Sequence, residues 1–196
     1  MAGVSTNGRQ RSGRQSERAA ALAGLLQQEC ARLLELYAER ESFPSDPESR
    51  AQLVVIPPLT AQLSTAEKIG FLHAALGECL RLLEEVIRRE DAEFSDVEED
   101  EYKTQRRTVQ GRLGHLLIST ERLLVDGKTC AANVAAVPDS MDNGSFALKK
   151  WILQVLQDLE YWSSQAAVTL RSLPERAKAA RRTGRGARRL RGRLRR

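Results

Sequence analysis

Aromatic residues, cysteines and histidines are scarce in this sequence. Only 5% of the residues are Phe, Trp or Tyr, and the chain has three cysteines and two histidines. Three cysteines cannot all pair, so a disulfide framework is not indicated. His73 and His115 lack Cys or carboxylate partners at metal-ligand spacing, and there is no phosphate-binding loop, nucleophile elbow or H-E-x-x-H motif. We therefore expect no metal site, no cofactor and no enzymatic activity.

Long hydrophobic runs are also missing. No run reaches the roughly 18 to 20 apolar residues that a membrane-spanning helix needs, so we expect no membrane insertion. Basic residues precede the apolar residues 19–26, as they do in a signal peptide, but no small-residue cleavage site follows. The apolar spacing instead continues through Cys30, Leu33 and Tyr37. We expect a cytoplasmic pool of protein that has no cleaved export signal.

The net charge of +5 is unevenly distributed, because arginines crowd the segment after Pro174. Residues 174–196 lack an apolar stripe, so we expect a disordered basic tail, and a disordered segment at residues 1–14. Such a tail binds polyanions by counterion release, heparan sulfate outside a cell or RNA inside it. It has no aromatic residue on which bases could stack, so specific nucleic-acid recognition is not expected. The candidate polyanion-binding residues are Arg181, Arg182, Arg185, Arg188 and Arg189.

Leucine and alanine supply most of the apolar residues, and they recur at alternating steps of three and four, which is typical of a helix face packed in a core. Capping boxes at Ser64-x-x-Glu67 and Ser95-x-x-Glu98 predict two helix starts, and Asp126-Gly127 and Pro174 predict two helix ends. Four segments show the spacing. The first, residues 15–41, has Leu22, Leu26, Cys30, Leu33 and Tyr37 on one face, and the second, residues 65–90, has Ile69, Leu72, Leu76, Cys79, Leu83 and Val86. The third has Tyr102, Val109, Leu113, Leu116, Thr120 and Leu123, and the fourth, residues 145–173, has Leu148, Ile152, Val155, Leu159, Trp162, Ala166 and Leu170.

The lengths of the connections indicate the topology of this predicted all-α bundle. The second helix is expected to be about 40 Å long, at about 1.5 Å per residue, whereas the connection at residues 91–95 can span only about 18 Å, at about 3.6 Å per residue. The second and third helices must therefore be antiparallel. Residues 42–64 and 127–144 are each long enough to return the chain to the end where it started. One long connection before and one after the short one favour a particular topology for residues 15–173: a long-chain four-helix bundle, up-up-down-down with two crossover loops. A simple up-down bundle with two long loops is the alternative.

Two runs of residues carry a resemblance to a known family. The run GSFALKKW at residues 144–151, continued by VLQDL at residues 155–159 and by Trp162, resembles the fourth helix of ciliary neurotrophic factor-like cytokines, which belong to the interleukin-6-type family. The run LSTAEKI at residues 63–69 resembles the start of their second helix. The resemblance covers residues 15–173 and leaves both ends of the chain without a counterpart.

This resemblance implies a cytokine that acts outside the cell and assembles a receptor complex to trigger JAK/STAT signalling. The complex contains an alpha receptor, the leukaemia inhibitory factor receptor and the shared signalling chain of interleukin-6-type cytokines. The family's F-x-x-K motif, which contacts the leukaemia inhibitory factor receptor, falls on Phe146 and Lys149, and a basic position of the alpha-receptor surface falls on Arg171. A second basic position of that surface is Gln165 here.

Alternative interpretations accompany these residues. Phe146 could close the core while Lys149 is ordinary surface, and Arg171 could simply complement the negative end of its helix. Trp162 lies on the core stripe, whereas Trp151 lies off it and is expected to flank the receptor-binding face. For the whole chain, the alternative function is an intracellular helical protein that binds RNA or another polyanion through its arginine-rich tail.

Overall fold

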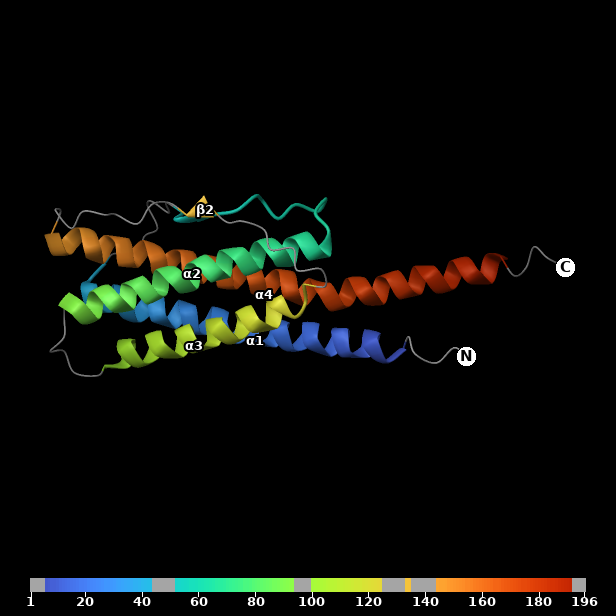
Figure 1. Ribbon diagram of the computed structural model, residues 1–196, viewed down its shortest axis with the longest axis horizontal. Coiled ribbons are helices and arrows are strands. Elements are labelled where there is room, and N and C mark those ends of the chain that lie inside the picture. Colours follow the sequence, from blue (N-terminus) through green and yellow to red (C-terminus); the bar gives the residue numbers. More distant parts are fainter. Residues whose placement is uncertain (1–5, 44–51, 94–99, 125–132, 135–143, 192–196) are drawn as a thin grey trace.

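The computed structural model describes residues 6–43, 52–93, 100–124, 133–134 and 144–191, and for 6–12, 133–134, 144–145 and 174–191 it describes the backbone alone. Four helices dominate: α1 (Thr6–Glu41), α2 (Thr65–Glu93), α3 (Glu101–Glu121) and α4 (Gly144–Arg191) (Figure 1). Two short strands, β1 (Val54–Val55) and β2 (Asn133–Val134), pair antiparallel. The predicted all-α four-helix bundle is confirmed.

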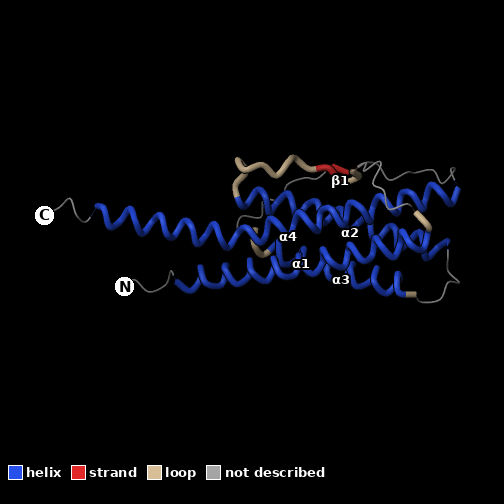
Figure 2. The backbone as a smooth tube through the Cα atoms, turned by 180° about the vertical axis from the view of Figure 1, so that it is seen from behind, coloured by secondary structure: helices blue, strands red, loops and turns tan. Residues whose placement is uncertain are grey.

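Each helix lies beside two others, and neighbouring helices run in opposite directions. Helix α1 packs against α3 and α4, and α2 packs against the same two helices. Tyr37, near the end of α1, contacts Lys149 near the start of α4, whereas Gln27 contacts Ser164 farther along α4. The ribbon colours in Figure 1 show α1 and α2 running one way and α3 and α4 running back, and Figure 2 shows the same four helices side by side from behind.

The core is a column of aliphatic side chains from all four helices. The predicted apolar stripes supply it, including Leu33, Leu76, Leu113 and Leu159, each completely buried. The two described cysteines, Cys30 and Cys79, are free and buried, and burial raises the pKa of the Cys30 thiol to about 12. A thiol in this environment packs as a small hydrophobic group.

The start of α2 is capped as its sequence predicts. Ser64 N donates to Glu67 Oε2 at 2.7 Å, and Glu67 N donates to Ser64 Oγ at 3.2 Å, which confirms the capping box. Helix α3 begins at Glu101, with Asp100 as its N-cap residue, later than the capping box at Ser95 and Glu98 predicted. That pair and the predicted stop at Asp126-Gly127 lie outside the described residues, and α3 ends at Glu121.

The first and the last helix of the chain, α1 and α4, are longer than expected. Helix α1 starts at Thr6, whereas the sequence predicted a start near residue 15, and α4 continues through Pro174 to Arg191, so the predicted helix end at Pro174 is wrong. The disorder expected at residues 1–14 and 174–196 stays a prediction. Adding residues to an existing helix avoids the cost of nucleation, and alanine and arginine have high helix propensity. The φ angle that proline fixes is itself helical, but within a helix proline removes one backbone hydrogen bond and its ring crowds the carbonyl group four residues earlier.

The segment between α1 and α2 is attached to α4 by a buried acid that the sequence interpretation missed. Oδ2 of Asp158 accepts hydrogen bonds from the backbone N–H groups of Leu53 and Val54, both at 2.7 Å. Trp162 is buried as predicted, and its Nε1 donates to Val54 O at 3.3 Å. Strand β1 is thereby fixed along α4, and β2 pairs with it from the connection between α3 and α4.

Candidate functional site

The candidate site lies at the end of the bundle where α1 stops and α4 begins. Ser42 has φ 55°, in the left-handed region that non-glycine residues seldom adopt. Phe43 N donates to Ala38 O at 3.0 Å, and Ser42 N donates to Glu39 O at 3.3 Å. These two bonds form a Schellman cap, which turns Phe43 back toward the helix that it follows. The Phe43 ring accordingly stacks on Tyr37, with the centroids 6.3 Å apart.

Phe146 is the most exposed of the large apolar side chains in the described part of the chain. Its exposed fraction is 69%, whereas Leu148, on the same turn of α4, is 4% exposed. Its ring lies 6.4 Å from that of Phe43, so the cap of α1 supports it from one side. An exposed aromatic ring backed by a second ring can serve as an anchor for another protein.

Lys149 lies one turn beyond Phe146 and is held by α1. Its Nζ atom is 2.6 Å from Oε2 of Glu41, and its side chain is 35% exposed. The hydroxyl of Tyr37 donates to the main-chain carbonyl of Lys149 at 3.0 Å. Both contacts fix the first turns of α4 against the last turn of α1, and they place the aromatic ring and the cation on one surface.

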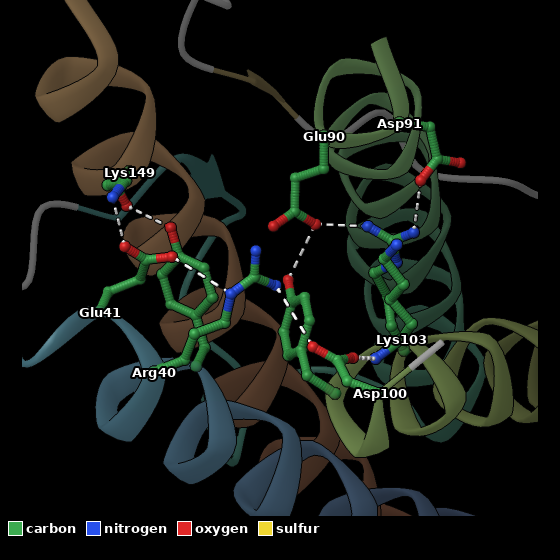
Figure 3. A network of polar contacts seen from close by, with 10 residues as sticks. Arg40, Glu41, Glu90, Asp91, Asp100, Lys103 and Lys149 are labelled. Atoms are coloured by element: carbon green, nitrogen blue, oxygen red, sulfur yellow. Dashed lines mark hydrogen bonds and ion pairs between the residues drawn. The ribbon is translucent and has the colours of Figure 1, made fainter. Parts of the chain in front are cut away.

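A network of polar contacts extends from Lys149 and Glu41 into the bundle, as Figure 3 shows. Arg40 lies 3.4 Å from Glu41 and 3.9 Å from Asp100, and its guanidinium lies 5.2 Å from the centre of the Tyr102 ring. Burial is the main reason that the pKa of Tyr102 is well above its usual value. The hydroxyl of Tyr102 donates to Oε2 of Glu90 at 3.0 Å. Contacts through Glu41, Arg40 and Tyr102 therefore connect Lys149 with the buried carboxylate of Glu90 near the end of α2.

Trp151 does not flank the exposed surface, so that expectation is wrong. It is 5% exposed and packs into the core. The guanidinium of Arg89 on α2 lies over its ring, 4.9 Å from the centroid. Helix α2 covers this face of α4, and spacing along α4 alone does not reveal that.

Arg171 lies far from the Phe146 surface. From Lys149 to Arg171 the helix rises about 33 Å at about 1.5 Å per residue. The Arg171 side chain is exposed and lies against Gly24 of α1, where an added Cβ would be 2.7 Å from its Nη2 atom. Gln165 is half-buried on the same helix. The structure thus separates the predicted sites for two receptors along α4.

The candidate polyanion-binding residues belong to the last turns of α4. Arg181, Arg182, Arg185, Arg188 and Arg189 have helical backbone, and their side chains lie outside the described part of the structure. Within that part, no group of three or more His, Cys, Asp or Glu side chains could hold a metal ion. No described helix is long and apolar enough to cross a membrane.

Comparison with known proteins adds no relative. No family model matches the chain, and no curated protein matches it significantly. The family resemblance therefore depends on the runs at residues 63–69, 144–151 and 155–159 and on Trp162.

Proposed function

We propose that this protein is a helical cytokine that acts outside the cell by holding receptor chains together. The proposed partners are an alpha receptor, the leukaemia inhibitory factor receptor and the shared signalling chain of interleukin-6-type cytokines, and the output is JAK/STAT signalling. The protein would be released from a cytoplasmic pool. In this proposal Phe146 and Lys149 contact the leukaemia inhibitory factor receptor, and Arg171 contacts the alpha receptor.

The observation that carries this proposal is the exposure of Phe146. A phenylalanine that closed the core would lose most of its exposed area, yet this ring is 69% exposed. Phenylalanine, like the other aromatic residues, is enriched in protein–protein interfaces relative to the rest of the protein surface. The neighbouring cation, Lys149, adds a charge that can orient a partner, because electrostatic complementarity sets specificity and association rate.

The helix arrangement supports the same proposal. Helices α1 and α2 each pack against α3 and α4, which is the pairing that an up-up-down-down bundle requires, whereas in a simple up-down bundle α1 would pack against α2. We propose that residues 42–64 and 127–144 are its two crossover loops. The pairing of β1 with β2 joins these two connections on one side of the bundle. A bundle of this kind presents several separate helix faces, as binding to three receptor chains needs.

The experiment is a cell assay with defined receptors. Recombinant protein is added to cells that express the alpha receptor, the leukaemia inhibitory factor receptor and the shared chain, and STAT phosphorylation is measured. We expect a response from the complete set and a loss of response when the leukaemia inhibitory factor receptor is omitted. Absence of any response from the complete set would contradict the proposal.

A second candidate function is polyanion binding by the arginines after Pro174. The observation that favours it is the continuation of α4 to Arg191, because a helix holds the basic residues at fixed spacing. Retention on heparin that falls steeply with salt and is lost on removal of residues 175–196 would support this function. STAT phosphorylation that is unchanged by the same truncation would separate it from receptor binding.

A further inference from the structure

The ion pair between Glu41 and Lys149 joins residues that are distant in the sequence but adjacent at the candidate site. The carboxylate of Glu41 is mostly buried, with 11% of its side chain exposed, whereas the Lys149 side chain is 35% exposed. The anion thus lies on the inner side of the pair and the cation on the outer side.

Glu41 is itself held in place from two directions. It is the last residue of α1, directly before the Schellman cap at Ser42 and Phe43. Its carboxylate also lies 3.4 Å from Nε of Arg40. An anion fixed by both its backbone and a neighbouring cation can define the position of the ammonium group that it binds.

A lysine at a binding surface ordinarily has many rotamers, and a partner that uses it must order the side chain at a cost in affinity. In this protein the 2.6 Å contact with Glu41 has already ordered Lys149 in the free state. An ammonium group has three donors, so donors remain for a further acceptor.

We infer that Glu41 is a positioning residue that pre-orders Lys149 for a partner carboxylate, an inference that rests on the proposed function. The ring of Phe146 defines the other half of the recognised chemistry. The partner then has to offer an apolar pocket for the ring and, one helix turn away, an acidic side chain for the ammonium group. Lys150, whose side chain is exposed, adds positive charge beside this contact.

The first test uses the free protein. The ammonium group of Lys149 is observed by nitrogen-15 NMR, where a group held by a largely buried carboxylate exchanges its protons slowly enough to give a signal. We expect the signal in the wild type, its loss in Glu41→Gln, and its retention in the matched control Glu39→Gln, which changes an exposed acid on the same helix turn. Absence of the signal from the wild type, or its persistence in Glu41→Gln, would overturn the inference.

The second test is a double-mutant cycle with the ectodomain of the leukaemia inhibitory factor receptor as the probe. Glu41→Gln should weaken binding by about three- to tenfold, the cost of ordering one long side chain, and Glu39→Gln should not. In a Lys149→Gln background, Glu41→Gln should have no further effect. A residue that merely stabilised the fold would give additive losses, and that result would overturn the inference.

The two tests distinguish this inference from the proposed function. Wild-type protein that binds no receptor while its Lys149 signal is present would overturn the proposed function, and with it the partner role, but not the pairing of the two residues. Binding that is strong and insensitive to both Glu41 and Lys149 would overturn the inference and leave receptor binding intact.

Discussion

The guanidinium of Arg106 donates a hydrogen bond to the carboxylate of Glu90, and both side chains are almost completely buried, with exposed fractions of 2% and 6%. Arg106 also donates to Oδ1 of Asp91 at 2.9 Å. Burial raises the pKa of Glu90, and the positive charge of Arg106 opposes that rise. The pair connects the end of α2 with the first turns of α3.

Arg106→Met should therefore lower the free energy of unfolding strongly. The substitution leaves the Glu90 carboxylate buried without its cation, and loss of one partner from a buried pair typically costs about 3 to 5 kcal/mol. Denaturant unfolding at neutral pH measures the loss. Arg81→Gln removes an exposed pair with Glu78 and serves as the control, with an expected change of about 0 to 1 kcal/mol. Equal effects of the two substitutions would contradict this account of the buried pair.

Stability should depend on pH through Glu85. Hydrogen bonds from Arg88, and then from Arg89, lower the pKa of Glu85 from 4.5 to about 2. The unfolded chain therefore binds a proton more readily at this residue, so its contribution to stability is present above about pH 4.5 and is lost as the pH falls toward 2. Glu85→Gln should destabilise the protein at pH 7 and have a smaller effect near pH 2.5. In a background with Arg88→Gln and Arg89→Gln that difference should largely disappear, and its persistence would assign it to another group.

Asp158→Ala should release β1 from α4. The substitution removes the acceptor of the Leu53 and Val54 N–H groups, and hydrogen bonds to a charged group contribute about 1.5 to 3 kcal/mol each, so we expect a loss of about 3 to 6 kcal/mol. Amide hydrogen exchange at Leu53 and Val54 should quicken at least about tenfold. Gln157→Ala, on the neighbouring position of α4, should leave both amides protected. Unchanged exchange in Asp158→Ala would show that other contacts hold this segment.

Ser42→Gly should stabilise the protein by about 0.5 to 1 kcal/mol. Ser42 adopts φ 55°, a conformation that costs an ordinary residue about 1 kcal/mol or more and costs glycine little, although glycine adds entropy to the unfolded chain. Ser172→Gly, on the exposed side of α4, should have the opposite sign, since glycine is unfavourable within a helix. Thermal unfolding of both variants makes the comparison. A loss of stability in Ser42→Gly would mean that the serine side chain stabilises the cap.

Much of the fold could be predicted because it follows from local rules. The three-and-four spacing of the apolar residues predicts the helix faces, and the capping box at Ser64 and Glu67 predicts where α2 begins. The lengths of α1 and α4 were missed because their outer segments lack an apolar stripe and were therefore assigned to disorder. Strand β1 was also missed, although the apolar, β-branched run at residues 53–56 is the signal that could have found it.

The candidate site could be predicted in part. Phe146 and Lys149 stand out in the sequence because they share a helix face and belong to a family-like run. Glu41 carries no such signal, since only the packing of α1 on α4 brings it to Lys149. The burial of Trp151 likewise depends on packing between helices, where Arg89 of α2 lies over its ring. Contacts between helices depend on tertiary packing, which periodicity within one helix does not specify.

The most direct measurement compares receptor affinity and stability in Phe146→Ala. We expect the affinity for the leukaemia inhibitory factor receptor to fall by about 2 kcal/mol or more, near thirtyfold, and the free energy of unfolding to change by less than about 0.5 kcal/mol. Val168→Ala, also exposed but near the opposite end of the bundle portion of α4, should change neither quantity. Unchanged affinity in Phe146→Ala, or a loss of about 3 to 5 kcal/mol in stability as for a core phenylalanine, would contradict the account.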